Sequence, residues 1–325
     1  MQAIQISATG GPEVLRPVEL PMPAAGDGEV LVRAHAIGVG KPDFLFRTGV
    51  YRWMPKLPAV PGSEMTGHVA ALGAGVSGLQ VGQPVLAVNY TGGCYAEYAA
   101  VPAGAVTALP DTVDLDDAVS MPNYQTAWAL LYEAAHGKAR SLYINGAAGG
   151  IGSAVIQLCK HAGIAAIAGA STAEKCAFAR QQGAAHTVDY SRERVAERVL
   201  ELTSGHGVDL VLDHIVGRDF TDNLKMLAPL GQIVSFNVLG GLPEKDLFRE
   251  MRAHLPKSPS VRCFTMHSYD HDPAAKQRIV AAVLAVFAAG AVKPPVYRKL
   301  PLAEARRAHE MLDAREVLGK LILKP

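Results

Sequence analysis

A glycine-rich segment, GAAGGIG at residues 146–152, is the part of the sequence whose residue types and spacing most clearly indicate chemistry. It follows the apolar run LYIN at 142–145 and precedes a helical pattern over 153–162. In such a strand–loop–helix unit, the N–H groups at the start of the helix point at an anion that the loop approaches closely. The spacing therefore predicts a site for the pyrophosphate of a dinucleotide, with an ordinary tight turn as the alternative.

The residues of this segment have distinct expected roles. Gly149 would let the backbone approach the pyrophosphate, and Gly152 would let helix and strand pack closely. Gly150 and Ile151 would add N–H groups at the helix N-terminus. Ala147 stands where the strict G-x-G-x-x-G pattern has its first glycine. The prediction therefore depends on the surrounding strand and helix as much as on the glycines.

The end of the next apolar run, at 165–170, indicates which dinucleotide would bind. An NAD site places Asp or Glu at this point to hold the ribose 2′-hydroxyl. This chain has Ser171 and Thr172 there, Lys175 one helical turn later, and Tyr190 at the end of the following run. Hydroxyls and a cation suit a 2′-phosphate, which an acidic residue would repel. We therefore expect NADPH rather than NADH, although Lys175 could also be an ordinary solvated helix residue.

The elements that must position these residues form an α/β pattern in the middle of the chain. The strands lack polar alternation and are joined by helices, which predicts a doubly wound parallel sheet covered on both faces. Strands are expected at 142–145, 165–170, 186–190, 208–215, 232–238 and 260–266, and helices at 153–162, 173–182 and 192–203.

The two ends of the chain have a different character. The first hundred or so residues are expected to be β-rich, with strands at 29–39, 66–76 and 83–89 separated by Gly and Pro. The tail is expected to contain helices at 274–289 and 302–313, the strand VYRKL and a final apolar run, GKLILKP. We expect this tail to rejoin the N-terminal β domain, which would make that domain discontinuous.

Composition limits the classes of function. The 31 Lys and Arg residues nearly balance the 30 Asp and Glu residues, which argues against bulk binding of nucleic acid or anionic lipid. Four widely spaced cysteines predict reduced, buried thiols rather than a disulfide framework. The N-terminus shows no secretory signal, and the longest apolar run, 279–292, is too short to span a membrane. We expect a soluble, cytoplasmic protein.

Several motifs together resemble one superfamily. RTGVY at 47–51, GSEMTGHVAALGAGVSGLQVGQPV at 62–85 and the glycine loop resemble the medium-chain dehydrogenase/reductase superfamily, and within it the zinc-independent quinone oxidoreductases. The resemblance extends essentially over the whole chain. It implies a GroES-like catalytic domain, 1–117 and 268–325, with a Rossmann dinucleotide-binding domain, 118–267, inserted into it. The cofactor is expected in the cleft between the two domains.

The chain departs from the zinc-dependent members of that superfamily. Their G-x-C-x-S-D segment supplies a cysteine ligand and a relay hydroxyl, but here Gly40 and Pro42 stand at those positions. Their G-H-E triplet supplies a histidine ligand, but here Ser63 precedes Glu64. Catalytic zinc needs three protein ligands, and this region offers at most Glu64. We therefore expect no catalytic metal.

A metal-free site favours an acceptor that is already electron-poor. Without a Lewis acid, the oxyanion that forms needs a positioned hydrogen-bond donor. Tyr51, in the RTGVY segment that resembles active-site sequence in the family, is the expected donor; a tyrosine that only holds a loop is the alternative. The family commonly has Asn where this chain has Gly40. Lys41 is therefore either a substitute polar group or a phosphate contact.

Other roles come from the resemblance alone. It implies that Thr126, at the start of the YQTAW helix, lies near the nicotinamide ribose and that Asn237, at the end of the fifth strand, meets the carboxamide. Phe264 on the sixth strand and Arg315 match positions that close over the cofactor, although Arg315 could simply face solvent. The family pairs its edge strand, here 260–266, with that of a second subunit, which predicts a homodimer.

The leading hypothesis is therefore an NADPH-dependent quinone reductase that transfers hydride directly to its acceptor. An enone or enoyl-thioester reductase on the same scaffold is the first alternative. A non-enzymatic protein that binds NADPH or single-stranded nucleic acid is the second. The near-neutral charge and the scarcity of aromatic residues, 6% of the chain, argue against nucleic acid.

Overall fold

The computed structural model describes all residues, 1–325, and the chain forms two compact units. The first unit contains Met1–Pro122 and Phe287–Pro325, and the second contains Asn123–Val286. The unit boundaries fall inside helices α3 (Met121–Trp128) and α8 (Pro273–Ala288). The domain bounds expected from the sequence, at 117/118 and 267/268, remain a prediction for the functional division of the chain.

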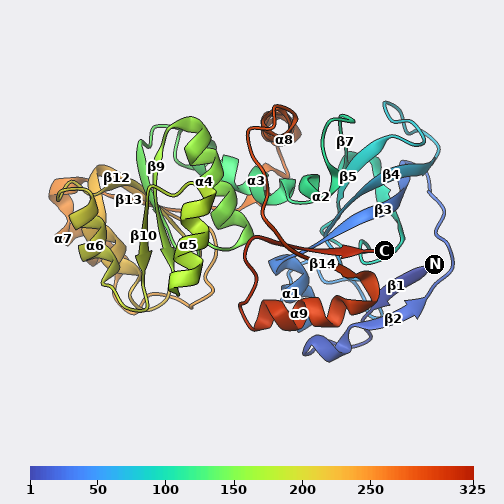
Figure 1. The fold of residues 1–325 in the computed structure, drawn as a ribbon, viewed down its shortest axis with the longest axis horizontal. Helices are drawn as coiled ribbons and strands as arrows, with labels where there is room; N and C mark the ends of the chain where they lie inside the picture. The colour runs from blue at the N-terminus through green and yellow to red at the C-terminus, as the bar shows by residue number, and fades with distance from the viewer. The chain divides into compact units, whose positions relative to one another are not determined.

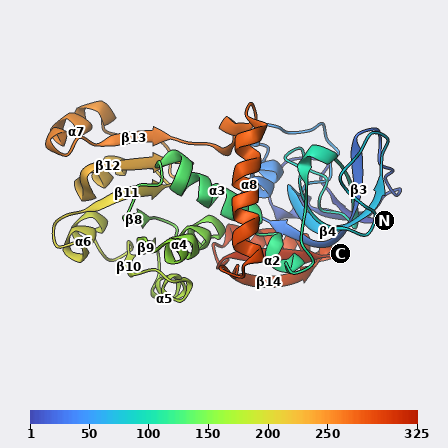
Figure 2. The same cartoon turned by 90° about the horizontal axis from the view of Figure 1, so that it is seen from above.

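The second unit is built on a six-stranded sheet in which every pairing is parallel. The strand order is β10-β9-β8-β11-β12-β13, so the chain reverses its direction across the sheet between β8 and β11 (Figure 1; Figure 2 labels all six strands). This arrangement confirms the predicted doubly wound sheet. Its strands are β8 (Ser141–Ile144), β9 (Ala165–Ala170), β10 (His186–Asp189), β11 (Val208–Asp213), β12 (Leu227–Ser235) and β13 (Ser260–Cys263).

The helices of this unit begin and end where local sequence signals place them. α5 (Ala173–Gln182) is capped by Thr172, whose side chain accepts from the Lys175 N–H, and it ends at Gly183 in a left-handed conformation. α4 (Gly150–Ala162) and α5 pack against each other, whereas α6 (Val195–Leu202) packs against a short 3-10 segment (Figure 2). The helix predicted at 192–203 starts later because residues 189–193 form a turn that the Asp189 side chain stabilises.

The core of the second unit lies between the sheet and these helices. Tyr143, Val188, Val211 and Ile233 from four different strands are almost fully buried, together with Phe220 after β11. Continuous apolar strands bury both faces, which is why their sequences show no polar alternation. α7 (Leu247–Ala253) has no fully buried residue and exposes Phe248.

The first unit is a β-rich body with a mainly antiparallel sheet. Its sheet order is β14-β15-β3-β4-β5-β7, and β6 also pairs with β3. The strands are β1 (Gln2–Gln5), β2 (Arg16–Glu19), β3 (Glu29–Val39), β4 (Glu64–Leu72), β5 (Pro84–Val88), β6 (Tyr98–Pro102), β7 (Val106–Ala108), β14 (Val296–Pro301) and β15 (Lys320–Lys324). The helices are α1 (Lys41–Thr48), α2 (Leu115–Ala118) and α9 (Ala305–Asp313).

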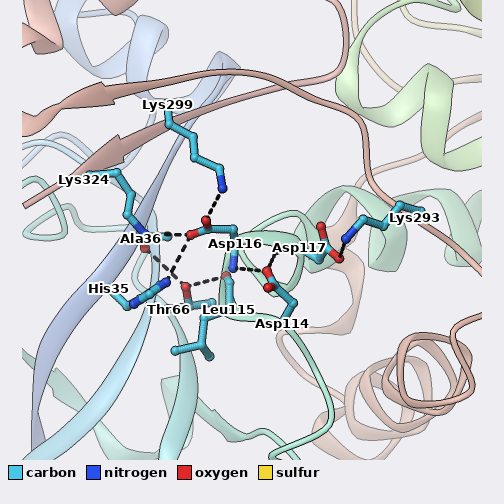
Figure 3. A network of polar contacts seen from close by, with 10 residues as sticks. All are labelled: His35, Ala36, Thr66, Asp114, Leu115, Asp116, Asp117, Lys293, Lys299 and Lys324. Atoms are coloured by element: carbon cyan, nitrogen blue, oxygen red, sulfur yellow. Dashed lines mark hydrogen bonds and ion pairs between the residues drawn. The ribbon is translucent and has the colours of Figure 1, made fainter.

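The C-terminal tail completes this sheet, as predicted. β15 pairs antiparallel with β3, placing Ile322 opposite Gly38, and parallel with β14 (Figure 1). A polar network on this tail centres on Asp116 of α2, which accepts from Lys299 of β14 and Lys324 of β15 (Figure 3). Burial opposes the ionised form of Asp116, but the two ammonium groups lower its pKa overall.

Two bulk predictions are tested by the fold. No helix in the chain is both long and apolar enough to cross a membrane. All four cysteines are free, but Cys263 is exposed, contrary to the expectation of four buried thiols. It is exposed because it ends β13, the edge strand of the parallel sheet.

Candidate functional site

The glycine-rich loop forms a tight turn from β8 into α4. Gly149 is the N-cap of α4 in an extended conformation, and no side chain caps this helix. Ser153 donates its N–H to the Gly149 carbonyl at 2.9 Å, which begins the helical hydrogen-bond pattern. The N–H groups of the first turn are therefore left to an outside acceptor, and the helix dipole favours an anion there.

Two glycines of this loop are required by close contacts. Gly146 has φ +58°, and a Cβ there would lie 2.2 Å from Cε1 of His214. A Cβ on Gly152 would lie 2.7 Å from the Cα of Ala147 and from the Gly146 carbonyl. A side chain at Gly146 would strain the turn and clash with the His214 ring, and one at Gly152 would push the helix away from the turn after β8.

Three of the predicted cofactor residues lie together at the ends of β9 and β10. Ser171 directly follows β9, and the Lys175 ammonium lies 3.5 Å from its hydroxyl. Tyr190 directly follows β10 and donates its N–H to the Ala170 carbonyl at 3.0 Å. The structure thus places two hydroxyls and one cation at the same edge of the sheet as the glycine loop.

A cavity of about 510 Å³ lies at this edge, within the second unit. Tyr190 and Arg194 line it from one side, Ile215 and Val216 from the turn after β11, and Asn145 from the end of β8. Ligands of parallel α/β sheets bind outside the carboxyl ends of the strands, where the strand order reverses. The cavity has the position and size for the adenosine part of a dinucleotide.

Asp213 organises the wall of this cavity, and sequence reasoning missed it. Its buried carboxylate accepts from the N–H groups of Ile215 and Val216 at 2.8 and 3.0 Å and from the side chains of Asn145 and Asn223. Val216 has φ +60°, a costly conformation for a β-branched residue, and the hydrogen bond to Asp213 helps to hold it. An acid ending the apolar strand VDLVLD was the available signal.

Three other predicted site residues lie at different points of their helix or strand than the sequence indicated. Thr126 lies near the end of α3 rather than at a helix start, because the helix already begins at Met121. Asn237 lies two residues beyond β12 and is exposed. Phe264 follows β13 directly, is buried, and donates its N–H to the Ser235 carbonyl at 2.8 Å. Both strands end earlier than predicted because their ladders stop at Ser235 and Cys263.

Arg315, the fourth residue carried over from the resemblance, follows α9 in the first unit. It is exposed and has φ +56°, with its N–H donated to the Leu312 carbonyl at the helix end. This geometry is a C-terminal helix cap in a residue type that seldom adopts it.

Tyr51, the predicted hydrogen-bond donor, belongs to the first unit and has an unusual hydroxyl. The oxygen is buried and has no hydrogen-bond partner, while its ring packs on Phe46 and Trp53. Burial raises the pKa of Tyr51 above its usual value, so the hydroxyl remains protonated. An unpaired buried donor costs free energy and is often kept for a ligand.

Lys41 does not join Tyr51 in a common pocket. It is the first residue of α1, and its ammonium lies 3.5 Å from the centroid of the Phe44 ring on the same helix. Partial burial lowers the pKa of Lys41. The small pocket beneath Tyr51 is lined instead by residues that include Asp43, Ser63 and Tyr90.

Asp43 joins the two positions at which the metal ligands of zinc-dependent relatives would stand. Its carboxylate accepts from the Gly40 N–H at 2.8 Å and from the Ser63 N–H at 2.9 Å. It is almost fully buried. Burial, together with the nearby Glu64 carboxylate, raises the pKa of Asp43 to about 7.

Glu64 forms a buried ion pair with Lys320 of β15. Gly38 makes room for this pair, because a Cβ on Gly38 would lie 2.3 Å from the Glu64 carboxylate. The Lys320 ammonium also lies beside Gly40, 3.8 Å from where a Cβ would be. The one candidate metal ligand of this region is thus bound by a cation, and the residues present do not fit a zinc site. Sequence reasoning missed Lys320, although a lysine directly before the apolar run LIL was a signal.

The family comparisons cover both units. Residues 150–281 match the family described as zinc-binding dehydrogenase, and residues 26–111 match the alcohol dehydrogenase GroES-like domain. The first description names a metal whose ligand positions hold Gly40 and Ser63 in this chain. The family assignment therefore concerns the fold and the ancestry of the chain, while its site chemistry has to be taken from its own residues.

Individual relatives narrow the assignment. The chain is 34% identical over 329 residues to a quinone oxidoreductase from Pseudomonas aeruginosa, covering 99% of each chain. A quinone oxidoreductase structure from Pseudomonas syringae superposes with a TM-score of 0.90 at 33% identity, covering 100% of this chain and 99% of that one. The Escherichia coli quinone oxidoreductase complexed with NADPH superposes with a TM-score of 0.91 at 27% identity, covering 100% of both chains. The chain belongs to the quinone oxidoreductase family of the medium-chain dehydrogenase/reductase superfamily.

Proposed function

We propose that this protein is an NADPH-dependent oxidoreductase that reduces a quinone, or a similar electron-poor carbonyl acceptor, by direct hydride transfer. The observation that carries this proposal is the uncapped N-terminus of α4 beside Ser171, Lys175 and Tyr190. That arrangement suits a pyrophosphate and a nearby 2′-phosphate. It occurs in a chain whose structural relative from Escherichia coli is complexed with NADPH.

Different residues are proposed to bind different parts of the cofactor. The N–H groups of Gly150, Ile151 and Gly152, approached over Gly149, would hold the pyrophosphate. Ser171, Lys175 and Tyr190 would hold the 2′-phosphate, and the 510 Å³ cavity would hold adenosine. Thr126, Asn237, Phe264 and Arg315 are proposed for the nicotinamide half, as the family resemblance implies.

The reduction needs one hydride and one proton for each acceptor. The bound cofactor supplies the hydride, and NADP⁺ is the other product. The protonated hydroxyl of Tyr51 would donate a hydrogen bond to the acceptor oxygen as negative charge develops there. Lys41 would either assist this site or contact a cofactor phosphate. The hydroquinone oxygen takes its proton from water.

The proposal includes no metal. Gly40 and Ser63 offer no ligand side chain, and Lys320 engages Glu64. A quinone carbonyl is already electron-poor, so a hydrogen-bond donor can replace the Lewis acid that an unactivated alcohol would need. Added zinc should not raise the activity, and it should not bind to the protein stoichiometrically.

We also propose a homodimer formed through β13. The outer edge of this strand has no neighbour within the chain, and an unpaired edge invites pairing with another copy. The segment between β12 and β13 exposes Leu242, Phe248 and Leu255, which would gain from being covered. Light scattering after size exclusion tests this, and a monomer at micromolar concentration would contradict it.

The central experiment measures oxidation of NADPH by its loss of absorbance with 1,4-benzoquinone, crotonyl-CoA and a simple alkenal as acceptors. Turnover with the quinone at the highest kcat/KM supports the proposal. A preference for crotonyl-CoA or the alkenal would favour the enone or enoyl-thioester reductase. Binding of NADPH with no turnover of any acceptor would favour a non-enzymatic protein.

A further inference from the structure

Arg194 lies at a place where helix stability does not explain it. It is the N-cap residue of α6, and its side chain makes no capping hydrogen bond. The positive end of the helix dipole disfavours a cation at this end. Its one ion pair, with Glu197 at 3.0 Å, joins two largely exposed side chains and contributes little.

Arg194 lines the proposed cofactor cavity. Arg194 and Tyr190 line the cavity together, and the apolar side chains of Ile215 and Val216 line it from the turn after β11. The cavity is therefore lined by a cation and an aromatic ring on one chain segment and by aliphatic groups on another. Its lining also includes acidic residues, which disfavour an anionic ligand part there: Glu197, Asp213, Asp219 and Asp222. Such walls fit a flat, neutral, aromatic ring.

Arg198 gives the matched contrast within the same helix. It lies one turn later, pairs with Glu193 at 3.2 Å and with Glu201 at 2.8 Å, and does not line the cavity. Arg194 is the exposed N-cap residue of α6 and lines the cavity, whereas Arg198 is a partly exposed residue within the helix and does not. The two ion pairs of Arg198 account for that residue, while the single ion pair of Arg194 does not explain why an arginine lines the cavity.

We propose that Arg194 is a further cofactor-binding residue, whose guanidinium stacks on the adenine ring held between it and Val216. This inference rests on the proposed NADPH function and adds a residue to it. A guanidinium is planar and weakly hydrated, and it stacks on aromatic faces better than an ammonium does. The contact is with the base, so it is independent of the 2′-phosphate that Lys175 would bind.

Calorimetric titration of NADPH, NADH and 2′,5′-ADP into three variants tests the proposal. Arg194→Ala should weaken all three ligands by a similar factor, about fivefold, the size of a partly exposed cation–π contact. Arg194→Lys should recover less than half of that loss, because the planar stacking group is still missing. Arg198→Ala, the matched control, should bind all three ligands like the parent protein.

The pattern across ligands distinguishes the outcomes. A loss confined to NADPH and 2′,5′-ADP would overturn adenine stacking, because it would make Arg194 a phosphate contact. Unchanged affinities in Arg194→Ala would also overturn it. Turnover of quinones is not part of this test, so a protein that binds the nucleotides but reduces no acceptor would refute the proposed function and leave the Arg194 contact standing.

Discussion

The polar groups of the two units are arranged in opposite ways. At the carboxyl edge of the parallel sheet, the first turn of α4 has no side-chain cap, Lys175 lies beside the Ser171 hydroxyl, and Tyr190 lines a cavity. In the β-rich unit, the cluster of Asp43, Glu64 and Lys320 is buried and each group is bound by another part of the chain. The first region leaves backbone N–H groups for an outside acceptor, as the proposed cofactor site requires, whereas the buried cluster pairs its own polar groups.

The difference shows how one fold can keep a cofactor site while its metal site is lost. Backbone N–H groups at a helix N-terminus depend only on the turn, so they remain whatever the neighbouring side chains become. A metal site depends on three side chains, and Gly40 and Ser63 remove two of them. The buried carboxylates left behind need a positive charge, and Lys320 supplies it.

Breaking the buried cluster of Asp43, Glu64 and Lys320 should have the largest effect on stability. Lys320→Met would leave Glu64 buried without its partner and should lower the free energy of unfolding by about 3–5 kcal/mol, measured by denaturant titration. Adding Glu64→Gln should recover much of that loss. Lys299→Met, which removes an exposed partner of Asp116, is the control and should cost at most about 1 kcal/mol. Equal stability of Lys320→Met and the parent would show that the buried pair contributes nothing.

The raised pKa of Asp43 should make the stability contributed by this buried cluster depend on pH. Because the folded-state pKa is raised to about 7, the group's contribution is present in full below the unfolded value and is lost as pH rises toward 7. The parent's stability advantage over Asp43→Asn should therefore be about 2–3 kcal/mol greater at pH 5 than at pH 8. Denaturant titration of both proteins at each pH measures this. A pH-independent advantage would mean that Asp43 stays ionised.

Distorting the glycine loop before α4 should have a smaller effect on stability but a clear effect on NADPH binding. Gly152→Ala places a Cβ against the Gly146–Ala147 backbone and should cost about 1–3 kcal/mol in unfolding. It should also weaken the binding of NADPH by at least about tenfold, because the N-terminus of α4 would move. Gly163→Ala strains the C-cap of α4, where φ is +72°, but meets no neighbouring atom, so it lowers helix stability without changing the loop. Unimpaired NADPH binding by Gly152→Ala would place the cofactor elsewhere.

Removing the single side-chain contact proposed for Lys175 should have the smallest effect, and only on cofactor affinity. Lys175→Ala should weaken NADPH by roughly tenfold and leave NADH nearly unchanged, because only NADPH carries the 2′-phosphate. Lys160→Ala, in the last turn of α4, is the control and should alter neither affinity. Fluorescence titration with both cofactors measures the ratio, and equal losses for the two cofactors would refute the phosphate role.

Much of the second unit could be predicted because its signals are local. β9 and α5 lie at the predicted residues, 165–170 and 173–182. Apolar runs between glycines, and Thr172 as a helix cap, are contained in short stretches of sequence. Element ends were less predictable: α6 starts at Val195 because the Asp189 side chain stabilises a turn before it, which the charge pattern of the helix did not indicate.

The sequence by itself determined the parallel-sheet unit, the glycine turn, the absence of an acid after Ala170 and the loss of two metal-ligand side chains, since each is a property of neighbouring residues. Only the tertiary structure decided what Glu64 does. Its partner Lys320 is 256 residues away in the chain and reaches it through the pairing of β15 with β3. The same is true of the cavity, whose walls come from separate strands. Contacts between distant segments depend on strand order, and strand order does not appear in any local pattern.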